Sequence, residues 1–142
     1  MKQLLHPDIL EAIARNGHGA KVLITDLNYP VATCTPPGAV RVFLNLYTDC
    51  ISVSEVLRVL HAAMPVESAI AQELADGAPQ PFHEEYQSIL GGSVPFSKLQ
   101  KEHFYQHANS QDNCLTIVTG DTQRGANIVL VMGLKGRNRP TA

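Results

Sequence analysis

Hydrophobic positions along this chain follow two spacings, and they predict alternating helices and strands. Apolar residues at helical spacing predict helices over residues 8–15, 53–64, 82–90 and 98–108. Short uninterrupted apolar runs predict strands over residues 21–25, 40–46, 115–119 and 127–132. Ser52 and Ser97 stand where helix N-caps are expected, and Gly17 is expected to end the first helix in a left-handed conformation. Interleaved helices and strands predict an α/β or α+β sheet covered by helices.

The segment over residues 66–74 fits neither spacing well. Its Ala, Glu, Gln and Leu residues favour a helix by intrinsic propensity. Alternation along a strand would place Val66, Ser68 and Ile70 on one face together with Gln72, which is a poor apolar stripe. The pattern alone therefore predicts a helix here.

Composition narrows the class of protein. The chain has 142 residues, enough for a single domain over 1–142, with a tail at 136–142 that is expected to fray. Charged residues make up 17% and the net charge is −2, which excludes a nucleic-acid footprint and hints at surface covered by other subunits. No apolar run is long enough to span a membrane. Three scattered cysteines fit a reducing compartment, so cytoplasm is the expected location.

The first candidate chemistry is His18 between two glycines, followed after a short strand by Asp26 on a turn. Histidine has the side-chain pKa nearest to neutral pH, so it can both give and take a proton. The alternative is a histidine that only caps the end of a helix.

Two other polar clusters are weaker. His103 and His107 are four residues apart on a predicted helix, a spacing that suits zinc, but no Glu directly follows the first, and two surface histidines are the alternative. The loop over residues 119–127 joins two buried strands and either binds a ligand or merely turns the chain. No nucleophile-elbow, phosphate-loop or dinucleotide motif is present.

Several short motifs occur together in one order. They are Gly17-His18-Gly19, Ile24-Thr25-Asp26 with Tyr29-Pro30, the stretch 52–57, Thr119-Gly120-Asp121, and 125–130 closing on Gly133. Over about residues 3–134 they resemble the D-ribose pyranase and L-fucose mutarotase (RbsD/FucU) family, most closely its fucose branch. The resemblance implies one α/β domain with a mixed β-sheet covered by helices. It also implies that Val66 to Ile70 form a strand, against the helix that the pattern predicts.

The resemblance further implies an isomerase that interconverts the anomers of a fucose- or ribose-like monosaccharide. It implies no metal or organic cofactor, and a homo-oligomeric ring, commonly a decamer, with sites between subunits. His18 matches the family's catalytic proton donor, and Asp26 matches a substrate-binding acid. Lys101 falls where family members carry a substrate-binding His or Arg.

The chain departs from the family at the start of the closing motif. Asn127 matches the Asn of the family's Tyr-x-Asn motif, but Gly125 stands where the family has Tyr. The neighbouring Arg124 could occupy the vacated space, and Ala126 and Asn127 keep backbone groups for substrate. The substitution brings the standard substrates into question.

Anomer exchange opens and recloses a cyclic hemiacetal, and each proton transfer by a positioned group is worth about 10²- to 10⁴-fold in rate. His18 can act as acid and then base, Asp26 can hold sugar hydroxyls, and Lys101 or Arg124 can stabilise developing charge.

The eight residues from His18 to Asp26, if fully extended, would place the two side chains about 26 Å apart. Either the turns curl both into one pocket, or two subunits share it. Two alternatives to a mutarotase are a non-catalytic sugar-binding protein of the same fold and a purely structural subunit.

Overall fold

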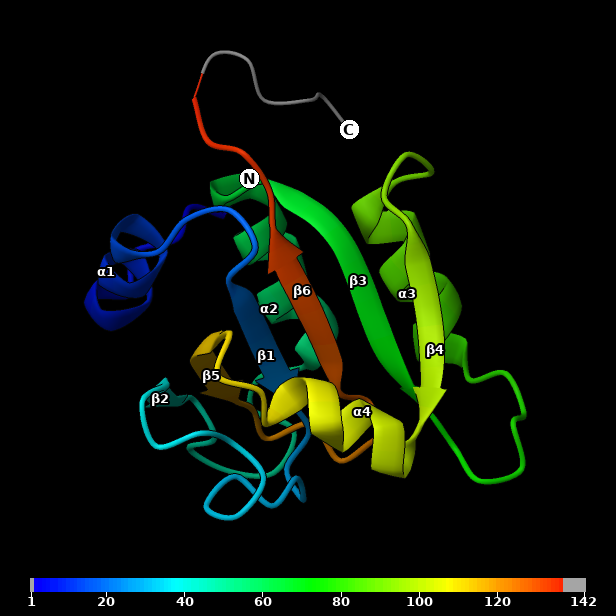
Figure 1. Cartoon of the computed structure of the whole chain (residues 1–142). Helices are drawn as coiled ribbons and strands as arrows, with labels where there is room; N and C mark the ends of the chain where they lie inside the picture. The colour runs from blue at the N-terminus through cyan, green and yellow to red at the C-terminus, as the bar shows by residue number, and fades with distance from the viewer. Residues whose placement is uncertain (1, 137–142) are drawn as a thin grey trace.

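A six-stranded sheet forms the centre of the molecule in the computed structural model, which describes residues 2–136 (Figure 1). Its strands are β1 (Lys21–Thr25), β2 (Val40–Phe43), β3 (Val66–Glu73), β4 (Phe96–Gln100), β5 (Asn113–Val118) and β6 (Ile128–Met132). Their spatial order is β2-β5-β1-β6-β3-β4. β5 pairs in parallel with β1 and β2, and β3 with β4, whereas β6 runs antiparallel to both of its neighbours. The predicted mixed sheet is therefore confirmed; the expected frayed tail, from residue 137 on, lies outside the described residues.

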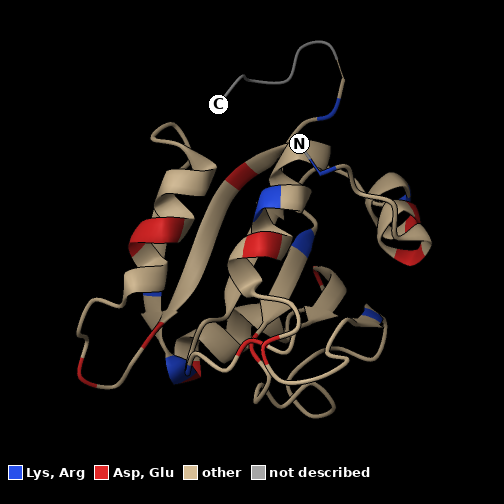
Figure 2. Ribbon diagram, turned by 180° about the vertical axis from the view of Figure 1, so that it is seen from behind, with Lys and Arg blue, Asp and Glu red and all other residues tan. Residues whose placement is uncertain are grey.

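Four helices cover this sheet: α1 (Pro7–Arg15), α2 (Val53–Ala63), α3 (Pro81–Leu90) and α4 (Lys101–Ala108). The larger core joins α1, α2 and α3 to one face, and a smaller core packs α4 on the other (Figure 1). Figure 2, seen from behind, shows Lys and Arg interspersed with Asp and Glu along the ribbon. No helix within residues 2–136 has the length and apolar content needed to cross a membrane.

The central strands explain why their sequences are so uniformly apolar. On β1, Val22 and Ile24 lie in the larger core, whereas Leu23 lies in the smaller one under α4. All three side chains are fully buried. A strand covered on both faces needs apolar residues at every position, and such strands read as continuous runs.

Helix α2 is capped from two directions. The Ser52 hydroxyl accepts a hydrogen bond from the Glu55 backbone N–H at 3.1 Å, as the capping pattern predicts. The Asp121 carboxylate accepts from the Val53 backbone N–H at 2.9 Å. Asp121 belongs to the loop between β5 and β6, so its buried carboxylate ties this loop to the start of α2.

The helix predicted from pattern over residues 66–74 is wrong, and the strand implied by the family resemblance is confirmed. β3 covers Val66–Glu73 and is hydrogen-bonded to β6 on one side and to β4 on the other. Pairing on both edges overrides the helical propensity of its Ala, Glu and Gln residues, a context that a local pattern does not contain.

The helix predicted over residues 98–108 begins later than expected. Phe96–Gln100 forms strand β4 at the edge of the sheet, and α4 begins at Lys101, so Ser97 lies within a strand and is not a cap. Similarly, β2 ends at Phe43 rather than at residue 46. At the first helix, the left-handed glycine is Gly19, with φ of +90°, and not Gly17.

Candidate functional site

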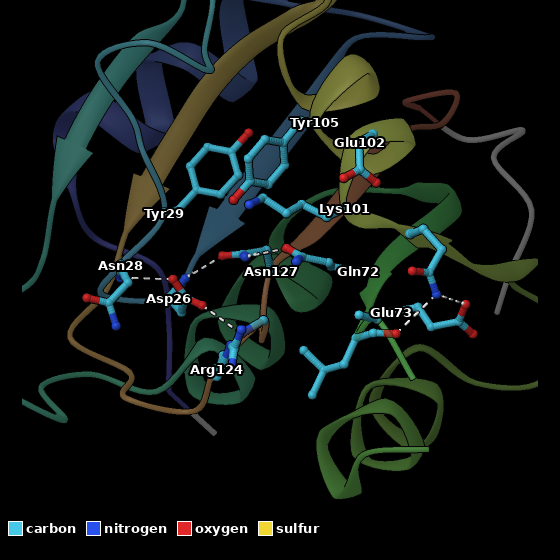
Figure 3. Close-up of a pocket in the computed structure, with 14 residues that line it drawn as sticks. Asp26, Asn28, Tyr29, Gln72, Glu73, Lys101, Glu102, Tyr105, Arg124 and Asn127 are labelled. Atoms are coloured by element: carbon cyan, nitrogen blue, oxygen red, sulfur yellow. Dashed lines mark hydrogen bonds between the residues drawn. The ribbon is translucent and has the colours of Figure 1, made fainter. Parts of the chain in front are cut away.

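A cavity of about 250 Å³ lies where β1 and β3 end, between the loop over residues 119–127 and the start of α4 (Figure 3). This volume is just below the range of about 300–1,000 Å³ that is usual for drug-sized ligands, so the cavity suits a small molecule. Its charged lining residues are Asp26, Glu73, Lys101, Glu102 and Arg124. Carboxylates and cations together favour a ligand with many hydrogen-bonding groups over an apolar one.

Asp26 is the most firmly held group of the cavity. It directly follows β1 and is only 4% exposed. One carboxylate oxygen accepts from the Asn28 backbone N–H and the other from the Gly125 backbone N–H, both at 2.9 Å. The Asp26 N–H donates to the Asn127 side-chain oxygen at 2.7 Å. The carboxylate is therefore fixed in position before any ligand arrives.

The surroundings of Asp26 also set its proton affinity. Burial raises the pKa of this carboxyl above its ordinary value of 3.8, and the nearby Asp121 charge raises it further. Backbone N–H groups of Asn28, Gly125 and Tyr29 act in the opposite direction and lower the pKa, but burial is the largest effect. Asp26 therefore takes up a proton at a higher pH than an exposed aspartate would.

Asn127 and its partner Gln72 form a buried amide pair beside Asp26 (Figure 3). The Asn127 side-chain N–H donates to the Gln72 side-chain oxygen at 2.8 Å, while its oxygen is used by Asp26. An amide carries two N–H donors, so one remains for a ligand. Sequence analysis missed Gln72, because it lies at the end of β3, in the segment whose local pattern predicts a helix.

Ala126, a predicted substrate-binding residue, has little access to the cavity. Ala126 is fully buried and does not line the cavity. Its N–H donates to the Gln123 carbonyl at 3.3 Å, and its carbonyl accepts from the Tyr86 hydroxyl at 2.7 Å. Both of its backbone groups thus have partners inside the chain.

Gly125 stands in a backbone conformation that suits glycine. Its φ is +75°, and a Cβ added there would lie 2.7 Å from the Leu74 side chain. Leu74, which directly follows β3, therefore occupies the space in which a side chain from residue 125 would begin. A tyrosine cannot be added at this position without straining the backbone and moving Leu74. Arg124 is exposed and lines the cavity on this side.

Helix α4 supplies the opposite wall of the cavity. The Lys101 ammonium lies 5.7 Å from the centre of the Tyr105 ring, and Tyr105 packs edge-on against Tyr29 at 5.0 Å between centroids (Figure 3). Burial raises the pKa of both phenols, so they remain neutral hydroxyls at physiological pH. Lys101 is exposed to solvent and lines the cavity.

Two lining residues that sequence analysis missed hold each other in place. The Gln100 side-chain N–H donates to the Glu73 carboxylate at 2.7 Å and to the Leu74 carbonyl at 3.0 Å. These residues end β4 and β3, which pair in parallel. Sequence analysis missed Glu73 and Gln100 because it predicted helices for the segments that contain them, residues 66–74 and 98–108.

His18 lies away from this cavity. It precedes β1, whereas Asp26 follows it, and the five residues of β1 hold the two ends about 13 Å apart. The His18 Nε2 is 2.6 Å from a carboxylate oxygen of Glu67, and the two side chains are 52% and 50% exposed. Within one chain, the turns therefore do not curl His18 and Asp26 into one pocket. Glu67 was not among the predicted site residues.

The histidines of α4 do not define a metal centre. No group of three or more His, Cys, Asp or Glu side chains within residues 2–136 is arranged to hold a metal ion. His107 lies 3.4 Å from the Lys21 ammonium, a poor neighbour for a metal ligand.

The cavity is small, and aromatic residues form part of its wall. Around it lie an anchored carboxylate, buried amides and cations, a combination that suits a small polar molecule. The chain matches the RbsD / FucU transport protein family over residues 1–135 and belongs to it. It is 28% identical over 148 residues to the fucose mutarotase of Homo sapiens, covering 95% of this chain and 92% of that protein. It is 30% identical over 135 residues to a D-ribose pyranase of Paracidovorax citrulli, covering 92% and 95%.

Solved structures show the same fold. The Bacillus subtilis RbsD complexed with D-ribose aligns with a TM-score of 0.79 at 24% identity, covering 96% of this chain and 98% of that one. The fucose mutarotase of Streptococcus pneumoniae in complex with L-fucose aligns with a TM-score of 0.77 at 23% identity, covering 92% and 94%.

Proposed function

We propose that this protein is a monosaccharide mutarotase that interconverts the anomers of a fucose- or ribose-like sugar. The observation that carries the proposal is the Asp26 carboxylate, held by two backbone N–H groups at the wall of a cavity of sugar-like size. Charge-assisted hydrogen bonds from sugar hydroxyls to such a carboxylate are among the strong ones. Relatives named fucose mutarotase and D-ribose pyranase support the reaction class.

The reaction needs one proton to reach the ring oxygen and one to leave the anomeric hydroxyl. In our proposal, His18 gives a proton to the ring oxygen as the bond from that oxygen to the anomeric carbon breaks. The anomeric hydroxyl loses its proton to water and becomes the aldehyde. After rotation about the bond from the anomeric carbon to the next carbon, the hydroxyl formed from the ring oxygen attacks the other face of the aldehyde and returns its proton to His18. Water returns a proton to the former carbonyl oxygen, which becomes the anomeric hydroxyl again. Glu67, 2.6 Å from Nε2, orients the imidazole and leaves Nδ1 to face the sugar.

Because His18 and Asp26 lie at opposite ends of β1, we propose that each working pocket combines them from two copies of the chain. A shared pocket requires at least two copies of the chain, and the family resemblance implies a homo-oligomeric ring with a decamer as the expected size. The edge strand β2 and the loop after it offer an apolar surface, with Phe43, Leu46 and Tyr47 exposed by 63%, 85% and 65%. Residues 27–48 carry a single charge, Arg41. An exposed apolar edge strand of this kind is suited to association.

Leu46→Asp should break the oligomer if this surface is an interface. A carboxylate forced into an apolar contact costs several kcal/mol, which is enough to shift assembly at micromolar concentration. Light scattering and sedimentation would measure the mass, and sugar exchange should fall in parallel. Leu5→Asp, at a leucine that is 74% exposed and precedes α1, is the matched control. A parent that is already monomeric, or a Leu46→Asp variant of unchanged mass, would contradict the placement.

The proposed activity is tested by saturation-transfer NMR on L-fucose, D-ribose and a panel of related sugars. We expect exchange of magnetisation between the α and β anomers to accelerate in the presence of the protein. The methyl glycoside of each sugar is the control, because it binds through the same hydroxyls but cannot open its ring. Failure to bind or exchange any sugar would overturn the proposal.

A second candidate is a non-catalytic sugar-binding protein of the same fold. The separation of His18 from the cavity within one chain favours it, as does glycine at position 125 in place of a hydroxyl donor. It predicts saturation transfer from the protein to sugars without faster anomer exchange.

The three cysteines, Cys34, Cys50 and Cys114, are free thiols. The cytoplasmic location stays a prediction.

A further inference from the structure

Helix α3 lies on the face of the sheet opposite to α4, yet it sends two buried polar side chains towards the backbone beneath the cavity. The Tyr86 hydroxyl, fully buried, donates to the Ala126 carbonyl at 2.7 Å. His83 is 4% exposed, and its Nε2 lies 2.8 Å from the Gln72 carbonyl. These two carbonyls belong to the segments that hold Asp26.

Tyr86 acts on Asp26 through the chain around Ala126. The residue before Ala126 is Gly125, whose N–H donates to the Asp26 carboxylate, and the residue after it is Asn127, whose side chain accepts from the Asp26 N–H. The Ala126 carbonyl belongs to the peptide that joins Ala126 to Asn127, so the Tyr86 hydrogen bond holds the backbone directly before the Asn127 side chain and two peptides after the Gly125 N–H. A phenylalanine would fill the same volume, so the bond to Ala126 is what the hydroxyl adds.

His83 acts through Gln72. Its Nδ1 accepts from the Gln80 backbone N–H at 3.3 Å, so the ring proton is on Nε2 and is donated to the Gln72 carbonyl. Burial lowers the pKa of His83, which keeps the ring neutral with both nitrogens in use. The Gln72 side chain in turn accepts from Asn127, which holds Asp26.

We propose that Tyr86 and His83 are positioning residues for the sugar site: from the far face of the sheet they fix the two backbone segments that aim the Asp26 carboxylate into the cavity. This inference rests on the proposed function only in taking the ligand of Asp26 to be a sugar. Neither residue lines the cavity, so neither is expected to touch the ligand.

Tyr86→Phe tests the proposal directly. With the Ala126 carbonyl released, the Gly125 N–H should bond Asp26 less well, and that N–H is one of the groups that lower the carboxyl's pKa. We expect the pKa of Asp26, followed by the ¹³C chemical shift of its carboxyl carbon against pH, to rise. Sugar affinity measured by NMR titration should fall about 2- to 13-fold, the usual effect of one net hydrogen bond. The charged groups around Asp26 are unchanged in this variant: Glu73, Lys101, Glu102, Asp121 and Arg124.

His83 offers a rescue experiment. His83→Gln keeps an N–H donor for the Gln72 carbonyl, and should retain most of the affinity and the parent titration of Asp26. His83→Leu removes the donor and should show both defects. If the two variants behave alike, the hydrogen bond to Gln72 does not position the site.

Leu90→Val is the control for packing, because it trims the buried core of the same helix without touching a hydrogen bond. The proposal is overturned if Tyr86→Phe leaves the Asp26 titration and the sugar affinity as in the parent, or if Leu90→Val alters them equally. Should no sugar bind the parent, the proposed function fails. The Asp26 titration of Tyr86→Phe still decides whether α3 positions this carboxyl.

Discussion

His18→Ala should lose about 10²- to 10⁴-fold of the acceleration of anomer exchange, the usual worth of one positioned proton-transfer group. The fold should survive, because the imidazole is half exposed and its hydrogen bond is to the equally exposed Glu67. Anomer exchange by NMR measures the loss, and thermal unfolding followed by circular dichroism checks the fold. Sugar affinity should change far less than the rate, since Asp26 and the cavity are untouched.

His103→Ala is the matched control, because it removes an exposed histidine that does not line the cavity. Glu67→Gln should give a smaller loss than His18→Ala, since the imidazole stays but loses the carboxylate that orients it. Parent-like exchange by His18→Ala would show that the acid in this reaction is another group.

The interior of the fold could be read from the sequence because its residues carry strong local signals. Strands β1, β5 and β6 are covered on both faces and leave continuous apolar runs. The serine cap of α2 is visible as a capping box, and Pro7 marks the start of α1. In each case the signal is carried by residues within a few positions of one another, although the strands themselves pair with distant segments.

The two strands that the pattern misread owe their conformation to distant partners. β3 pairs with β4 and β6, and β4 is an edge strand with exposed Ser97 and Lys98. Neither carries the clean apolar alternation that signals a strand. Gln72, Glu73 and Gln100 sit at the ends of these strands, and so the same error hid one wall of the cavity.

Residue types were readable at the site, but the roles depend on contacts between distant segments. Asp26 was identified as a binding acid, whereas its support by Gly125 spans 99 residues of sequence. Asn127 was expected to meet substrate, yet most of its amide is used to hold Asp26 and Gln72. Resemblance located His18 as a proton donor, and only the three-dimensional structure shows that β1 separates it from Asp26 in one chain.

Asp26→Asn should abolish sugar binding at the proposed site. Both carboxylate oxygens accept backbone N–H groups, and an amide offers only one oxygen, so one N–H meets an NH₂ group. We expect a stability loss of about 1–3 kcal/mol, the cost of an unsatisfied buried donor, and the loss of detectable exchange. Thermal unfolding and NMR exchange measure the two effects. An Asp26→Asn protein that still exchanges sugars at the parent rate would remove Asp26 from the site.

Co-assembly of the two inactive variants then tests whether each pocket is shared between subunits. When His18→Ala and Asp26→Asn chains are refolded together, some pockets receive an intact His18 from one chain and an intact Asp26 from the other. With equal amounts and random mixing, about half of the pockets receive an intact His18, and independently about half receive an intact Asp26. Roughly one pocket in four should therefore be restored. His18→Ala mixed with the double variant is the control, since no pocket can then contain His18. Mixed oligomers, identified by differently tagged chains, that remain inactive would show that His18 and Asp26 do not complete one another across an interface.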